Sequence, residues 1–157
     1  MKDQVLYKND AWDRKTVLAA METNDCVVRA IASSFSITYE ESHSFVEDYF
    51  QRKSRKGTRM VYLKMKALRE KFGKSVQELG IVMEGDSKRS MSFEYKVKGE
   101  VKYGSYTTAR FLKEYSEGTY FILISRHAFC IKDGVIHGNP EDAERLKARI
   151  QQAFKIG

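Results

Sequence analysis

The stretch from Asn24 to Phe35, NDCVVRAIASSF, predicts a helix with a cysteine in its first turn. Its apolar residues recur at helical spacing, and Thr23 or Asn24 is available as the N-cap. The start of a helix carries unpaired N–H groups and a partial positive charge, which lower the pKa of a thiol and can hold a developing oxyanion. Cys26 is therefore the predicted nucleophile, and the alternative is a small buried apolar residue.

A reactive thiol at this position needs a base, and Ser125-Arg126-His127-Ala128-Phe129 at the start of a predicted strand supplies one. A strand holds an imidazole rigidly, so His127 is the predicted general base. His137 is a weaker candidate, and His43 is expected on the surface of a helix. Cys130 lies three residues beyond His127 on the same strand, so it points to the opposite face and is expected in the core.

The third residue of the site depends on the register of the hairpin around Asp133-Gly134. With a two-residue loop, Asn139 lies opposite Ala128 and points away from His127. With a three-residue loop, Asn139 lies opposite His127, and its amide could orient the imidazole. Asn139 is thus a candidate orienting residue, and it is equally suited to be the N-cap of a final helix.

Along the chain, predicted helices come first and predicted strands follow. This order predicts an α+β fold in a single domain spanning residues 1–157. A second helix is expected from a capping box at Thr38-x-x-Glu41, and a third from Thr58 to Gly73. The later segments are expected to be a hairpin around residues 98–100, a helix over 108–115, strands over 119–125, 127–131 and 135–138, and a last helix after Asn139 with Leu146, Ile150 and Phe154 as its buried stripe.

The composition is that of a globular protein with a basic surface. Hydrophobic residues make up 42% of the 157 residues, and the formal net charge is +7. The one dense basic cluster, Arg52 to Lys56, falls in a predicted solvated loop with no aromatic platform beside it. Specific nucleic-acid binding is therefore not expected.

The cysteines and the apolar runs indicate the cellular compartment in which the protein is expected. Two distant cysteines make no disulfide framework, which favours a reducing cytoplasm. No apolar run is long enough to cross a bilayer, and the N-terminus has no secretory signal pattern, so no membrane association is expected. The scattered His and Cys residues lack metal-ligand spacing, so neither a metal nor another cofactor is expected.

Two stretches resemble the papain-like cysteine peptidases, especially the leader-peptidase domains of bacteriocin exporters. Asn24 to Ala30, followed by Phe35 and Tyr39-Glu40-Glu41, resembles the region of their catalytic cysteine. Gly118 to Asn139 resembles their histidine hairpin, and the order Cys, His, Asn agrees. These stretches, with Arg52 to Thr58, also resemble small uncharacterised proteins of tailed bacteriophages. The resemblance implies a papain-like fold, in which N-terminal helices pack on a C-terminal antiparallel sheet that carries the histidine.

The resemblance also implies a function. It suggests a cysteine peptidase or amidase-type hydrolase that acts on a protein or peptide, in the host cytoplasm if a phage encodes it. Such peptidases carry a glutamine shortly before the cysteine, whereas residues 19 to 23 read Ala-Ala-Met-Glu-Thr. The oxyanion is then expected to bind the backbone N–H of Cys26 and the amide of Asn24. This departure leaves open an amidase, an acyl transferase, or an inactive papain-like protein that binds a host target through its basic surface.

Overall fold

The structure is a computed structural model that describes residues 7–9, 25–50, 52–53 and 65–157, and it has the predicted α+β composition. Its helices are α2 (Cys26–Phe35), α3 (Tyr39–Phe50), α4 (Met65–Phe72), α5 (Thr108–Glu114) and α6 (Pro140–Glu144). Its strands are β1 (Tyr7–Asn9), β2 (Val76–Glu78), β3 (Val82–Glu84), β4 (Ser87–Arg89), β5 (Ser92–Val97), β6 (Glu100–Ser105), β7 (Thr119–Ile124), β8 (His127–Lys132), β9 (Val135–Gly138) and β10 (Gln152–Ile156).

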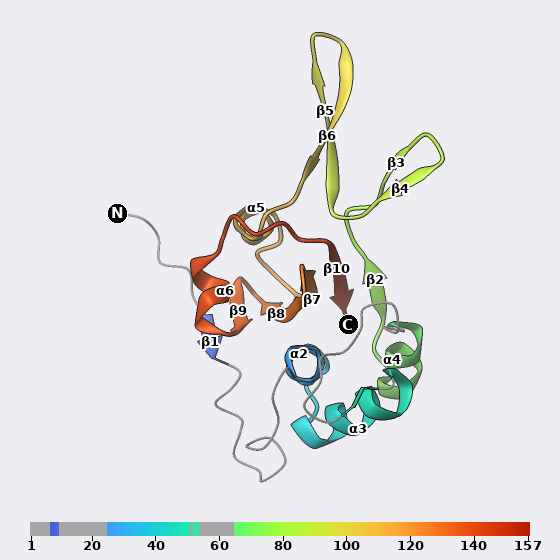
Figure 1. The fold of residues 1–157 in the computed structure, drawn as a ribbon, viewed down its shortest axis with the longest axis vertical. Coiled ribbons are helices and arrows are strands. Elements are labelled where there is room, and N and C mark those ends of the chain that lie inside the picture. Colours follow the sequence, from blue (N-terminus) through green and yellow to red (C-terminus); the bar gives the residue numbers. More distant parts are fainter. Residues whose placement is uncertain (1–6, 10–24, 51, 54–64) are drawn as a thin grey trace.

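A six-stranded sheet organises the body of the molecule, with strand order β1-β9-β8-β7-β10-β2. Its neighbours run antiparallel except for β1, which lies parallel to β9. The sheet is therefore not purely C-terminal, because its two edge strands, β1 and β2, come from earlier in the chain. The hairpins β3–β4 and β5–β6 form separate two-stranded sheets beyond one end of the body (Figure 1).

Two hydrophobic clusters cover the two faces of this sheet. On one face, α2, α3 and α4 pack against strand residues such as Phe121, Leu123 and Ala128. On the other face, α5 packs through Phe111 against a second set that includes Phe129. Figure 1 shows α2 and α5 on opposite sides of the central strands. Alternation along β7 and β8 thus supplies both cores from the same strands.

Several helix signals in the sequence are confirmed, although the N-cap of α2 is Asp25 and not Thr23 or Asn24. Helix α2 begins at Cys26 and ends at Phe35, and its C-cap residue Ser36 adopts the left-handed conformation with φ 55°. Thr38 and Glu41 form the predicted capping box, since each side chain accepts a hydrogen bond from the backbone N–H of the other. Helix α4 stops at Gly73 as predicted, whereas its expected start, from Thr58, lies outside the described residues.

The prediction of a long last helix was wrong. Helix α6 ends at Glu144, and the chain returns as β10 between β7 and β2. The four-residue spacing of Leu146, Ile150 and Phe154 imitates a helical stripe. The consecutive residues Ala153 and Phe154 are both buried, in the clusters on opposite faces of the sheet, so β10 lacks the clear alternation that would have identified it.

Two polar residues expected at the surface are buried. His43 is 7% exposed and Arg52 is 4% exposed, and the Arg52 Nη1 lies 3.4 Å from His43 Nε2. Arg52 also donates its backbone N–H to the carbonyl of Val46 just before the end of α3. The start of the basic cluster therefore belongs to the packed helical layer, while Lys53 is exposed and residues 54–56 lie outside the described part.

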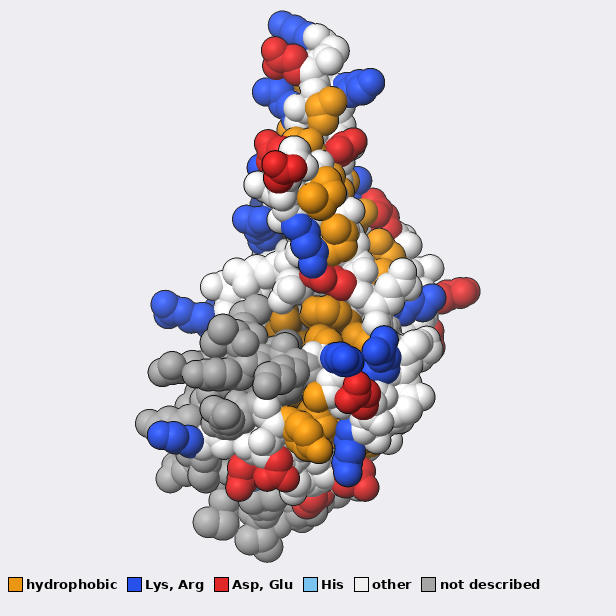
Figure 2. All heavy atoms as spheres, turned by 90° about the vertical axis from the view of Figure 1, so that its right-hand side faces the viewer, with side chains coloured by type: hydrophobic (Ala, Val, Ile, Leu, Met, Phe, Trp, Pro, Cys, Tyr) orange, Lys and Arg blue, Asp and Glu red, His pale blue; other side chains and the backbone are white. Residues whose placement is uncertain are grey.

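The β5–β6 hairpin projects from the body with apolar side chains on its surface. Its strands are joined by the predicted tight loop, in which Lys98 and Gly99 both have positive φ. Phe93 anchors the base, where the Arg110 guanidinium lies 3.5 Å from the ring centroid. Farther out, Tyr95 and Val101 are 43% and 48% exposed, and Figure 2 shows apolar side chains along this projection.

No helix in the described part of the chain combines the length and the apolarity needed to cross a bilayer.

This architecture predicts different costs for two truncations. Ile122, fully buried in the sheet, should lose about 2–5 kcal/mol of unfolding free energy when replaced by Ala. Val101→Ala on the projecting hairpin should change it by less than about 0.5 kcal/mol. Urea denaturation of both variants measures the difference, and equal costs would contradict the exposed position of the hairpin.

Candidate active site

Cys26 and His127 meet although 100 residues separate them in the chain. Cys26 is the first residue of α2 and is partly buried. Its thiol lies next to the His127 side chain and the backbone of Ala128. His127 is the first residue of β8, paired with Ile124 across the two-residue loop Ser125-Arg126. The structure therefore brings together the two residues that the sequence singled out as nucleophile and base.

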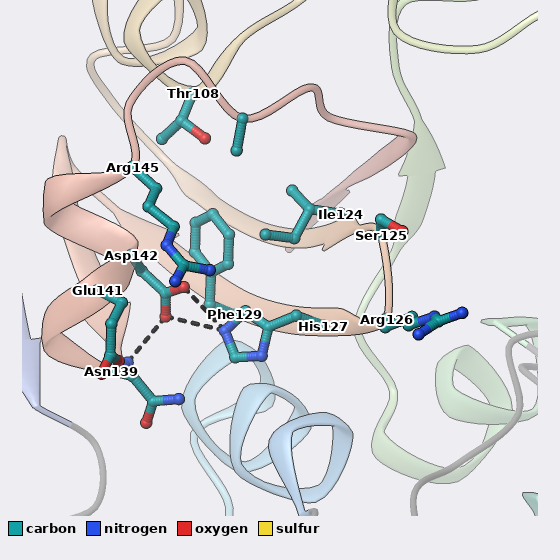
Figure 3. A pocket seen from close by; sticks show the side chains of 11 residues that line it. Thr108, Ile124, Ser125, Arg126, His127, Phe129, Asn139, Glu141, Asp142 and Arg145 are labelled. Atoms are coloured by element: carbon teal, nitrogen blue, oxygen red, sulfur yellow. Dashed lines mark hydrogen bonds and ion pairs between the residues drawn. The ribbon is translucent and has the colours of Figure 1, made fainter.

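Asp142 contacts the other side of the His127 ring. The His127 Nε2 lies 2.8 Å from Asp142 Oδ1 and 2.9 Å from Oδ2. A carboxylate accepts hydrogen bonds, so Nε2 carries the proton in this contact, which leaves Nδ1 for Cys26. Figure 3 shows the ring between Asp142 on one side and the helix α2 below it. The arrangement is a chain of three side chains, thiol, imidazole and carboxylate.

These contacts shift both pKa values toward a charged pair. Burial by itself raises the pKa of Cys26, but the hydrogen bond and charge of His127, with the Ala128 hydrogen bond, lower it overall. Burial by itself lowers the pKa of His127, whereas the contacts with Asp142 and Cys26 raise it to about 9. Opposite shifts of two touching groups favour a thiolate beside an imidazolium at neutral pH.

In the observed hairpin register, Asn139 does not lie opposite His127, where it was predicted to orient the imidazole. Lys132 pairs with Val135, so the Asp133-Gly134 loop has two residues. Asn139 is instead the N-cap residue of α6, and its Oδ1 accepts a hydrogen bond from Arg29 Nη1 at 2.9 Å. The orienting contact comes from Asp142, three residues further on. The N-cap-to-N3 spacing of Asn139 and Asp142 was the sequence signal that could have identified it.

The start of α6 fixes the Asp142 carboxylate. Its Oδ2 accepts a hydrogen bond from the Asn139 backbone N–H at 2.8 Å while also contacting His127. Gly138 makes room for it, because a Cβ at this position would overlap Asp142 Oδ2 and lie 3.0 Å from the Cβ of Phe129. Asp142 is 7% exposed, so its charge is held almost out of water. Its two hydrogen-bond donors offset that burial.

A buried polar network connects α2 to the same turn. Asp25 Oδ1 accepts a hydrogen bond from Arg29 Nε at 3.1 Å, and Asp25 Oδ2 accepts one from the Tyr39 hydroxyl at 2.6 Å. Arg29 then reaches Asn139 at the start of α6. The helix that carries Cys26 and the helix that carries Asp142 are therefore joined by the buried Arg29 and the partly buried Asn139.

Only part of the predicted oxyanion site falls within the described residues. The backbone N–H of Cys26 lies at the N-terminus of α2, ahead of the first helical hydrogen bond from Arg29 N–H to the Asp25 carbonyl. Asn24, the other predicted donor, lies outside the described part of the chain. The Ala128 backbone, which contacts the thiol, is a further polar group at this point that the sequence did not indicate.

A pocket of about 350 Å³ opens beside His127 on the side of Asp142. Its floor includes Ile124 and Phe129, and Arg145 from α6 extends into it (Figure 3). Cys26 is not one of its lining residues. His137, the weaker candidate base, pairs with Cys130 in the sheet, and Cys130 is fully buried.

Within the described residues, no group of three or more His, Cys, Asp or Glu side chains is placed to hold a metal ion. Comparison of the chain with family models, curated proteins and solved structures gives no match.

The pKa shifts predict selective labelling of the two thiols. Cys26 should react with iodoacetamide well below pH 8, while the buried Cys130 stays protected in the folded protein. His127→Ala removes the partner that lowers the Cys26 pKa, so labelling at pH 6.5 should slow by about tenfold or more. Peptide mapping by mass spectrometry measures both rates. Equal and slow labelling of the two thiols would contradict a pair of Cys26 thiolate and His127 imidazolium.

Gly138 offers a test of the Asp142 contact that leaves the reacting residues in place. Gly138→Ala should displace the Asp142 carboxylate and lower the pKa of His127 from about 9, because the imidazolium loses its anionic partner. An NMR titration of the His127 ring protons measures the shift. In an Asp142→Ala background, Gly138→Ala should cause no further decrease, and an additional decrease would show that the glycine acts by another route.

Proposed function

We propose that the chain is a cysteine-dependent hydrolase of the papain-like type, acting on an amide bond in a protein or peptide. Cys26 is the nucleophile, His127 the general acid and base, and Asp142 the residue that orients His127. The observation that carries the proposal is the contact of one imidazole with a helix-start thiol and a buried carboxylate. The order along the chain is Cys, His and an acidic residue.

The geometry supports a two-step acyl transfer. The Cys26 thiolate attacks the substrate carbonyl carbon, and the oxyanion that forms accepts hydrogen bonds from N–H groups at the start of α2. The C–N bond then breaks while His127 gives its proton to the departing amine, which leaves a thioester on Cys26. Water attacks the thioester, His127 takes a proton from that water, and release of the acid restores the thiolate and the imidazolium.

Asp142 keeps the ring ready for both steps. By accepting from Nε2–H, it fixes the tautomer and the ring plane, so that the proton moved in each step is the one on Nδ1. It also stabilises the charged ring, which must be present before attack. This role belongs to a positioning residue, because Asp142 contacts His127 and not Cys26.

The alternative is an inactive binding protein on the same scaffold, and the site favours the hydrolase. A binding protein has no need for opposite pKa shifts on a touching thiol and imidazole. Perturbed pKa values supported by a specific charged partner are typical of catalytic sites. In addition, the partners of His127 come from two separate helices, so its contacts depend on the whole fold.

Acylation by a simple activated ester tests the proposal without knowledge of the natural substrate. With p-nitrophenyl acetate at pH 7, intact-mass analysis should show one acetyl group, which peptide mapping places on Cys26. The variant Cys26→Ala should acquire none at this rate. Hydrolysis of the ester should follow a bell-shaped pH profile, because a low pH protonates the thiolate and a pH above about 9 deprotonates His127.

Asp142→Asn supplies the matched variant, since it is nearly isosteric and neutral. It should move the upper limb of this profile to lower pH by lowering the His127 pKa. A wild-type chain that is not acylated, with a thiol that labels as slowly as a free cysteine, would overturn the proposed function in favour of the binding protein.

A further inference from the structure

The pocket beside His127 lies where the leaving part of a substrate would sit. In the proposed reaction His127 protonates the departing amine, so the segment on the amine side of the cleaved bond must pass next to the ring. His127 and Asp142 line the pocket, whereas Cys26 does not. This inference rests on the proposed function, and it assigns the pocket to the leaving group rather than to the acyl part. Its volume of about 350 Å³ is at the lower end for a small-ligand site.

Arg145 is the charged group that extends into this pocket. It follows α6 as its C-cap residue, and Figure 3 shows its guanidinium pointing into the pocket toward His127 and Asp142. Among the described residues, the guanidinium has no hydrogen bond or ion pair. A guanidinium carries five N–H donors in a planar fork that matches a carboxylate, so an incoming carboxylate would find these donors uncommitted.

The other charges of the pocket leave it positive. Arg126 lines the opposite end, and His127 adds a positive charge when protonated. Asp142 is committed to His127 and to the Asn139 N–H, which leaves Glu141, at the exposed start of α6, as the one uncommitted acid of the lining. The balance disfavours a basic ligand and favours an acidic one.

The back of the pocket is polar as well. Thr108, at the start of α5, is 1% exposed, and its Oγ1 has no hydrogen-bond partner among the described residues. Figure 3 shows this hydroxyl on the pocket side of its helix. Ile124, Phe129 and Ala148 add apolar side chains to the lining. A short side chain with an apolar stem and a polar end suits this lining.

We propose that this pocket binds the first residue of the leaving group and selects a carboxylate there, held by Arg145. The carboxylate has two possible sources, an acidic side chain or a free α-carboxylate of the departing amino acid. Both have the same charge and the same match to a guanidinium, and three small amines distinguish them. Glutamic acid α-amide has only the side-chain carboxylate, glutamine has only the α-carboxylate, and glutaminamide has neither.

Binding of these amines to the full chain tests the pocket without any catalytic step. We expect one of the two carboxylate probes to bind at least about threefold more tightly than glutaminamide, as followed by the NMR shifts of the His127 ring. Arg145→Gln should abolish this preference. Lys147→Gln removes an equal charge from an exposed position outside the pocket and should preserve it. Glu141→Gln removes the negative charge that repels a carboxylate, so it should increase the preference for the carboxylate probe.

The outcomes separate this inference from the proposed function. Equal binding of all three probes, or a preference that survives Arg145→Gln, overturns the carboxylate pocket even if Cys26 is acylated. A shift of the His127 titration in Arg145→Gln without loss of the preference likewise overturns it, because Arg145 would then act on the site and not on the ligand. A carboxylate preference in a chain whose Cys26 is not acylated overturns the leaving-group assignment and the hydrolase together.

Discussion

The buried Arg29 side chain is the constraint on which the relative placement of α2 and α6 depends. It is 8% exposed, bonded to Asp25 at 3.1 Å within its own helix and to Asn139 at 2.9 Å across the fold. A buried charge is tolerated only when its hydrogen bonds are satisfied, so few arrangements of the two helices are allowed. The arrangement that satisfies Arg29 places the start of α2 and the start of α6 on two sides of His127.

The sheet fixes the position of His127 relative to the starts of α2 and α6. The Ser125-Arg126 loop makes His127 the first residue of β8, and the Asp133-Gly134 loop sets where β9 ends. Because β9 ends at Gly138, the chain turns into α6 next to the beginning of β8. A glycine at that junction lets the Asp142 carboxylate approach the ring. The site thus needs two tight turns, one strand end and one capping pattern, each of them a local structure with its own cause.

The sequence predicted the features that have a local cause and missed those that depend on contacts between distant parts of the chain. The helix start at Cys26, the strand start at His127 and the Asp-Gly turn each have local signals, and each is found in the structure. The identity of the orienting residue depended on a hairpin register for which two loop lengths were equally acceptable. The strand β10 was missed because burial on both faces removes its periodicity. The contact between Arg29 and Asn139 was not predicted, since nothing local indicates a partner 110 residues away.

Burial disfavours the charged forms of both Cys26 and His127. The reactivity of the site therefore depends on all of its contacting groups together. Desolvation alone would keep Cys26 a thiol and His127 a neutral imidazole. Their contact reverses this only because each group stabilises the charge of the other, with Asp142 behind the ring and Ala128 beside the sulfur. Removal of one member therefore leaves the rest in surroundings that favour the neutral forms. The fold must hold four groups from α2, β8 and α6 together, and the buried network of Asp25, Arg29 and Asn139 joins two of these elements, α2 and α6.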